Sequence, residues 1–377
     1  MNKKTYIFIF IIIVLAVVLS ACSAAATATS WPGLKVSDNL AYVAFGNYLY
    51  AVKMADGTMA WKFPQTEDKT QFFFPAAALE NNTLVVGNYA NQLYSIDATT
   101  GEQKWVYKDA KDKFFGSPLL INGITYAPNA DGHLYTLGSD GKLLWEFKTE
   151  KQNWSKPVTD DTNLYFASMD HFVYALKLNY TLDEISADEF GKRDAILKPL
   201  WKVDLGTAAF SDPVLSSKGV LYVGTLGGKI FAINTQNGEI LWSYPKTGEL
   251  GGIWFSVVLV DDVVFVADDS GMIHGLSAST GTELWSNSYD ASAPNTTAPI
   301  IGGGTALAGN AAFVITNGKF IVLNTQGSLV WSKDFNESLY TAPQVINGRL
   351  VLAAVGSDYL LTYFDQNSQF WSFNPPK

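Results

Sequence analysis

A repeat of about 40 residues that ends in tryptophan is the feature that most constrains how this chain can fold. The repeat occurs eight times, and its closing residues are Trp61, Trp105, Trp145, Trp201, Trp242, Trp285, Trp331 and Trp371. Successive members stand 40 to 46 positions apart, except for one interval of 56. The clearest copies are Leu84–Trp105, Leu221–Trp242 and Val264–Trp285. Such a period indicates an array or propeller in which each unit packs on its neighbours.

Each repeat has the pattern of β-structure. Short runs of β-branched and aromatic residues alternate with glycine-containing turns. Pairs such as Asp56-Gly57, Asp140-Gly141 and Asn237-Gly238 tolerate the positive φ that tight hairpins need. A further short strand, often opened by proline, precedes each apolar strand. Four strands in each unit predict an all-β, eight-bladed β-propeller of four-stranded antiparallel blades over residues 31–377.

The repeat resembles the PQQ-like (quinoprotein-type) propeller repeat. The resemblance is carried by the Leu-Tyr pair of the third strand and by the Gly-x-x-x-Trp that follows, as in Leu93-Tyr94 and Gly101 to Trp105. In that family the tryptophan packs between neighbouring blades, so the resemblance implies a structural role for the eight repeat tryptophans. Burying ~200 Å² of each ring would contribute roughly 5 kcal/mol before entropic costs.

The N-terminus has the pattern of a targeting segment. Lys3 and Lys4 precede an apolar run over residues 6–18, and small residues lead to Cys22. The sequence Leu-Ser-Ala-Cys resembles the lipobox of bacterial lipoproteins. We therefore expect a signal peptide over residues 1–21, lipidation of Cys22 and a flexible tether over residues 22–30. The alternative is an ordinary signal peptide with an incidental cysteine.

The charge and cysteine content exclude several classes of function. The chain has 26 basic and 35 acidic residues, so a nucleic-acid partner is not expected. Quinoprotein dehydrogenases resemble this repeat but hold their cofactor against a vicinal disulfide, whereas Cys22 is the only cysteine here. We therefore expect no PQQ, no other cofactor and no catalytic residue. The three histidines, His133, His171 and His274, fall in different columns of the repeat, so no metal site is expected.

One set of aromatic residues could form a binding surface. Each of them lies three positions before the residue that opens the inner strand, which is proline in five repeats and Val257 in one. The residues are Phe72, Phe115, Trp154, Phe210, Trp254 and Tyr340. This register predicts an aromatic collar around one mouth of the central channel, which would suit a peptide or glycan. The alternative is that the rings pack within or between blades. Residues 179–199, inserted in the fourth repeat, are either a surface excursion or a partner-docking loop.

These observations favour a non-enzymatic, extracytoplasmic lipoprotein that serves as a protein-interaction scaffold. Its layout is similar to that of propeller lipoproteins in outer-membrane β-barrel assembly, which implies an envelope protein as partner. Its membrane attachment would be the lipid, placed in the outer membrane where the organism has one and on the outer face of the cell membrane otherwise. We expect a monomer. A peptide- or glycan-binding surface protein and a PQQ-dependent oxidoreductase are the first and second alternatives.

The lipobox generates a direct prediction. Mass spectrometry of the native N-terminus should show a lipid on Cys22 and no trace of residues 1–21. Cys22→Ser should release the protein from the membrane or leave the signal segment uncleaved. An unmodified Cys22, or a mature chain that retains Lys3, would contradict the prediction.

Overall fold

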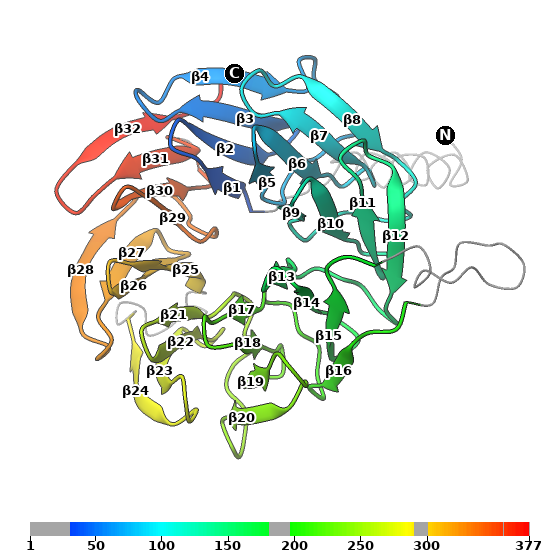
Figure 1. Cartoon of the computed structure of the whole chain (residues 1–377). Coiled ribbons are helices and arrows are strands. Elements are labelled where there is room, and N and C mark those ends of the chain that lie inside the picture. The colour runs from blue at the N-terminus through cyan, green and yellow to red at the C-terminus, as the bar shows by residue number, and fades with distance from the viewer. Residues whose placement is uncertain (1–30, 181–196, 290–300, 357, 377) are drawn as a thin grey trace, which may run out of the picture. The chain divides into compact units, whose positions relative to one another are not determined.

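Eight antiparallel sheets, each made of four strands consecutive in the chain, build the structure. The computed structural model describes residues 31–180, 197–289, 301–356 and 358–376, and no helix occurs among them. The sheets are arranged around a central axis as the blades of a propeller (Figure 1). The predicted eight-bladed, all-β architecture is confirmed.

The first four blades run from residue 33 to residue 204. Blade 1 comprises β1 (Gly33–Val36), β2 (Leu40–Phe45), β3 (Tyr48–Lys53) and β4 (Met59–Phe63). Blade 2 comprises β5 (Ala78–Glu80), β6 (Thr83–Gly87), β7 (Leu93–Asp97) and β8 (Gln103–Tyr107). Blade 3 comprises β9 (Leu119–Ile121), β10 (Ile124–Pro128), β11 (His133–Leu137) and β12 (Leu143–Lys148). Blade 4 comprises β13 (Val158–Thr159), β14 (Asn163–Ala167), β15 (Phe172–Lys177) and β16 (Trp201–Asp204).

The last four blades run from residue 214 to residue 373. Blade 5 comprises β17 (Val214–Leu215), β18 (Val220–Gly224), β19 (Ile230–Asn234) and β20 (Ile240–Tyr244). Blade 6 comprises β21 (Val258–Val260), β22 (Val263–Ala267), β23 (Met272–Ser277) and β24 (Glu283–Ser288). Blade 7 comprises β25 (Ile301–Leu307), β26 (Asn310–Ile315), β27 (Lys319–Leu323) and β28 (Leu329–Asp334). Blade 8 comprises β29 (Gln344–Ile346), β30 (Arg349–Ala353), β31 (Leu361–Phe364) and β32 (Gln369–Phe373).

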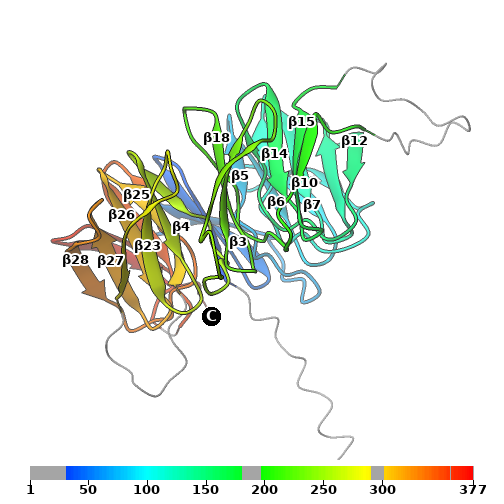
Figure 2. The same cartoon turned by 90° about the horizontal axis from the view of Figure 1, so that it is seen from below.

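The first strand of each blade is the innermost one, and the fourth strand forms the rim (Figure 1). In the perpendicular view the strands run between two faces (Figure 2). One face carries the loops between second and third strands and the connectors between blades, because these two sets of loops are hydrogen bonded to each other. For example, Tyr89 N donates to Phe72 O at 2.9 Å, and Met169 N donates to Gln152 O at 3.0 Å. We call this the connector face.

The repeat tryptophans lie on the fourth strands and contact the next blade. Trp61 Nε1, for example, donates to Ala98 O at 3.1 Å, and its ring covers Gly101. Gly101 has a φ of +77°, and a Cβ there would lie 2.7 Å from the ring. The same pair of contacts recurs at five other interfaces, where the tryptophans and glycines are Trp105 with Gly141, Trp201 with Gly238, Trp242 with Gly281, Trp285 with Gly327, and Trp371 with Gly57.

For the other two tryptophans, no contact with a glycine turn is found among the described residues. Trp145 faces blade 4, where β15 ends at Lys177 and β16 begins at Trp201, and it packs edge-on against Tyr180 at 5.3 Å. Trp331 faces blade 8, whose turn over residues 365–368 contains no glycine, and it lies 5.0 Å from Phe320 of its own blade.

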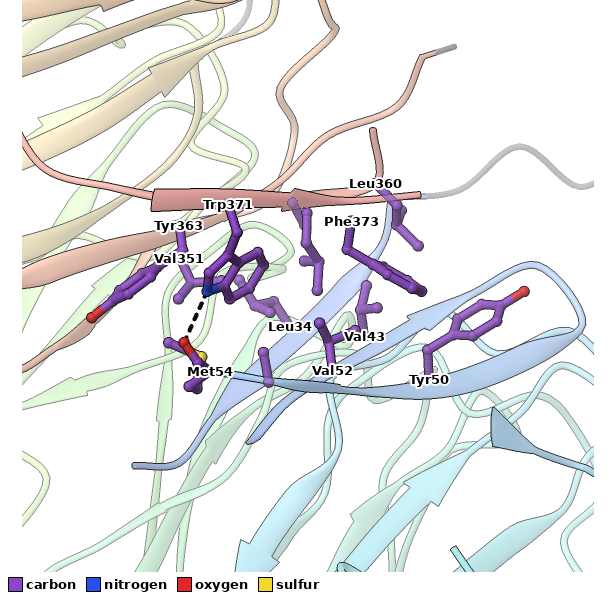
Figure 3. Packing of buried hydrophobic residues seen from close by; sticks show 13 residues of the cluster. Leu34, Val43, Tyr50, Val52, Met54, Val351, Leu360, Tyr363, Trp371 and Phe373 are labelled. Carbon is purple, nitrogen blue, oxygen red and sulfur yellow. Dashed lines mark hydrogen bonds between the residues drawn. The ribbon is translucent and has the colours of Figure 1, made fainter. Parts of the chain in front are cut away.

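The ring closes through side chains, since blades 1 and 8 are each built from one continuous segment. Trp371 of blade 8 donates from Nε1 to Met54 O of blade 1 at 2.9 Å (Figure 3). A buried cluster surrounds this contact and draws on both blades, with Leu34 and Val43 on one side and Val351 and Leu361 on the other. The two blades share no strand, so apolar burial at their interface is what stabilises the closed ring.

The glycine contact can be tested with two positions of equal φ. Gly101→Ala and Gly248→Ala both place a Cβ at φ +77°, which costs roughly 1–2 kcal/mol. At Gly101 the Cβ also meets the Trp61 ring, whereas at Gly248 nothing lies within 4 Å. Overpacking should add about 1–3 kcal/mol at Gly101. Chemical unfolding of both variants measures the difference, and equal losses would show that the ring contact is not tight.

Candidate functional site

Five of the six predicted collar residues occupy one structural position of the repeat. Each follows a buried residue, and these preceding residues are Phe114, Asn153, Ala209, Ile253 and Leu339. In four of the five connectors the backbone amide of the buried residue donates to the connector-face loop of the preceding blade, as Ala209 N does to Ser168 O and Ile253 N does to Thr225 O. These bonds fix the next side chain, such as Phe210 or Trp254, four residues before the innermost strand begins.

Phe72 is the exception, and here the register expected from the sequence was two residues out. Phe73 N donates to Gly46 O as Phe114 N does to Asn88 O, so Phe74 corresponds to Phe115. The error came from aligning the repeats on proline. Pro75 stands three residues before its inner strand, whereas Pro118 and its counterparts stand one residue before theirs.

The aromatic rings form a continuous series across blades 2 to 6. We define the aromatic arc as Phe74, Tyr89, Phe115, Trp154, Phe210 and Trp254. Consecutive ring centroids along this order are 5.0, 4.7, 4.6, 5.3 and 5.5 Å apart. These spacings are those of tilted and edge-to-face aromatic pairs, which stabilise each other by about 0.5–1.5 kcal/mol.

Two predicted residues lie beside the arc. Phe72 stacks on Phe74 at 6.3 Å. Tyr340 stacks on Trp31 at 6.0 Å, and Trp31 also lies 5.6 Å from Phe255. Trp31 and Phe255 were not predicted, because sequence spacing does not show that the residues before β1 meet blades 6 and 8.

Most rings of the arc remain accessible to solvent. Phe74 is buried, but Tyr89, Phe115, Trp154 and Phe210 are half-buried and Trp254 is 38% exposed. A row of accessible aromatic side chains on one face is typical of an interaction site.

A buried charged group supports the end of the arc. Asp268 Oδ2 accepts a hydrogen bond from Gly251 N at 3.2 Å, three residues before Trp254, and Asp269 Oδ2 accepts one from Trp254 Nε1 at 3.4 Å. Burial opposes ionisation of Asp268, but His274 and hydrogen-bond donors lower its pKa to about 2. Asp268 is therefore a carboxylate at neutral pH and holds the loop that carries Trp254.

Charged side chains follow the arc at the inner strands. Asp212 Oδ1 accepts a hydrogen bond from Lys156 N at 2.6 Å, and the two residues lie two positions after Phe210 and Trp154. Burial raises the pKa of Asp212. Burial and the charge of Lys156 lower the pKa of Lys35 on β1.

Some predicted features lie outside the described residues. These are Cys22 with residues 1–30, and the middle of the insertion, residues 181–196. Leu178, which precedes the insertion, and Leu197, within its described part, are buried between blades 3 and 4. In the described part of the chain, no three His, Cys, Asp or Glu side chains are grouped as metal ligands, and no helix is long and apolar enough to cross a membrane.

Comparison with known proteins assigns the family. The family model described as outer membrane protein assembly factor BamB matches residues 45–179, 198–312 and 269–374, most of the chain. The chain belongs to the BamB family. Its propeller is thus of the PQQ-like type that the repeat resembles.

Individual BamB proteins are distant relatives. BamB of Yersinia pestis is 24% identical over 283 residues, which are 68% of this chain and 66% of that protein, just under two thirds. BamB of Salmonella typhimurium is 25% identical over 345 residues, which are 75% of this chain and 82% of that protein. The crystal structure of BamB from Moraxella catarrhalis has the same fold, with a TM-score of 0.70, 16% identity, and coverage of 89% of this chain and 94% of that one.

The chain is also similar to enzymes. Quinoprotein alcohol dehydrogenase PedH of Pseudomonas putida is 32% identical over 137 residues, which are 33% of this chain and 23% of that protein. Tetrathionate hydrolase of Acidithiobacillus ferrooxidans is 23% identical over 301 residues, 68% of this chain and 54% of that protein. Membership of the BamB family therefore establishes the propeller type and not the activity.

Two adjacent residues test whether the arc is a surface. Ile253 is fully buried, so Ile253→Ala should cost about 2–5 kcal/mol of unfolding free energy. Trp254 is the larger side chain but is 38% exposed, so Trp254→Ala should cost no more than about 1 kcal/mol. Thermal or chemical unfolding of both variants gives the comparison. A loss at Trp254 as large as that at Ile253 would make its ring part of the core.

Proposed function

We propose that this BamB-family propeller is a non-enzymatic scaffold in the bacterial cell envelope, and that the aromatic arc is its partner-binding surface. The observation that carries the proposal is the unbroken series of rings on the connector face, of which all but Phe74 are accessible. Aromatic side chains supply much of the binding free energy at protein interfaces, and they lose little conformational entropy on binding. The names of the BamB relatives support a partner in outer-membrane protein assembly.

The rigid ring suits the arc to this role. Each arc residue after Tyr89 directly follows a buried residue of its connector. The buried residue anchors the connector, so the rings are positioned before a partner arrives. Preorganisation of this kind lowers the entropic cost of binding. The lipobox ending at Cys22 supports an extracytoplasmic position, with the lipid as the membrane attachment.

The absence of an enzymatic role is part of the same proposal. Cys22 is the only cysteine, so the chain has no pair to form the vicinal disulfide expected beside PQQ. We therefore expect the scaffold to act by binding alone, without cofactor or metal, and as a monomer.

Site-specific crosslinking in intact cells tests the arc. A photoreactive phenylalanine analogue replaces Trp254 in one variant, and Leu284 in the control. Leu284 is on β24 of the same blade, is 54% exposed, and lies at the rim. The variant at position 254 should give a discrete adduct with one envelope protein, and the control should not. Trp154→Ala should weaken the affinity of the purified pair by about tenfold, as for other aromatic anchors.

The crosslink also separates the competing functions. A glycan receptor would give no protein adduct at position 254. An adduct that forms at position 284 and not at position 254 would place the docking surface on the rim and contradict the proposal.

A further inference from the structure

A groove lies at the seam where blade 8 meets blade 1, away from the aromatic arc. Its volume is about 450 Å³, within the range of small-molecule sites. The walls come from the turn between β1 and β2, the turn between β29 and β30, and the outer strand β32. A smaller groove of about 140 Å³ lies between blades 2 and 3, lined by the corresponding turns.

One wall of the groove presents an arginine held against aromatic rings. The guanidinium carbon of Arg349 lies 4.1 Å from the ring centroid of Phe370 and 5.8 Å from that of Tyr363. Stacking on aromatic faces orients the planar guanidinium. Its Nη1 donates to Tyr363 Oη at 3.5 Å, and its other N–H groups are left for a ligand. Among the described residues, no carboxylate forms an ion pair with Arg349.

Arg349 is the one arginine among the described residues. The sequence contains arginine at positions 193 and 349, and position 193 lies outside the described residues. The first residue of the second strand is Arg349 in blade 8, whereas in the other blades it is Leu40, Thr83, Ile124, Asn163, Val220, Val263 and Asn310. The repeat itself therefore does not require a cation at this position.

The remaining walls of the groove supply a negative charge and apolar surface. Asp38 and Asn39 are exposed and come from blade 1. Phe370, which is 41% exposed, and Ile346 supply apolar surface. Trp371 also lines the groove and is fixed by its hydrogen bond to Met54 O (Figure 3). The groove thus combines a cation, an anion and an apolar floor.

We propose that this groove binds a small zwitterion with an apolar body, either a free hydrophobic amino acid or a short peptide. Its carboxylate would pair with Arg349 through the guanidinium fork. Its ammonium would pair with Asp38, and its apolar part would cover Ile346 and Phe370. A simple anion would be repelled by the carboxylate of Asp38, which selects against it.

Binding at this place would join the first and last blades. Because the ligand contacts residues of both, it would stabilise the closed ring by linkage. A saturating ligand should therefore raise the midpoint of thermal unfolding.

Titration calorimetry of the purified full chain tests the assignment with capped ligands. The probes are phenylalanine, its amide, its N-acetyl derivative and triphenylalanine with free ends. Phenylalanine should bind saturably, and amidation or acetylation should each weaken binding by roughly tenfold or more, because each removes one charged partner. Tighter binding of the tripeptide would identify peptides as the ligand source, and tighter binding of phenylalanine would identify free amino acids.

Matched variants assign the charges. Arg349→Gln should bind phenylalanine and its amide with the same affinity. Asp38→Asn should bind phenylalanine and its N-acetyl derivative with the same affinity. Lys142→Gln removes an exposed cation from blade 3 and should leave all affinities unchanged. Thermal midpoints of the variants without ligand confirm that each is folded. Binding that is insensitive to both caps, or no saturable binding of any probe, would overturn the proposal without bearing on the aromatic arc.

Discussion

The contact of a tryptophan ring with a glycine turn of the next blade is the interaction on which the rest of this structure depends. Each blade alone is a four-stranded sheet with two apolar faces, so it must be covered on both sides. The ring covers the turn, and its Nε1 satisfies a backbone carbonyl, as Trp242 does at Ala278 O. Only glycine fits there, because a Cβ would collide with the ring and the backbone has a positive φ. Packing and backbone conformation therefore select the same residue.

The candidate binding surface is a consequence of the same regularity. A connector that starts at the rim must cross the connector face to reach the next inner strand, and in the described connectors that carry the arc it brings the same repeat position to the approach of that strand. One buried residue fixes the connector, as Ile253 does, and the following residue is free to serve another purpose. An aromatic residue at that position in consecutive blades brings rings within 6 Å of each other without any further adaptation of the fold.

The fold could be predicted from the sequence because its periodicity is carried by residues with strong local requirements, the turn glycines and the repeat tryptophans. The site could be predicted only in part. Pro75 misled the alignment in blade 2, since proline marks a permissible φ and not a fixed position in the repeat. Tyr89 belongs to a different loop, and Trp31 reaches the far blades through ring closure. Both contacts join residues that are distant in the sequence, so the spacing of residues along the chain does not predict them.

Ring closure also distinguishes one interface from the other seven. Blades 1 to 8 are joined in order by the chain, but blade 8 meets blade 1 without a covalent connector or a shared strand. Side chains must therefore hold the seam, namely Trp371 through its hydrogen bond and the apolar cluster that includes Leu34. The same seam has a groove with an arginine on one wall and an aspartate on another. A ligand that pairs with both would act where the ring has least covalent support, so binding and closure would be coupled there more directly than at the other interfaces.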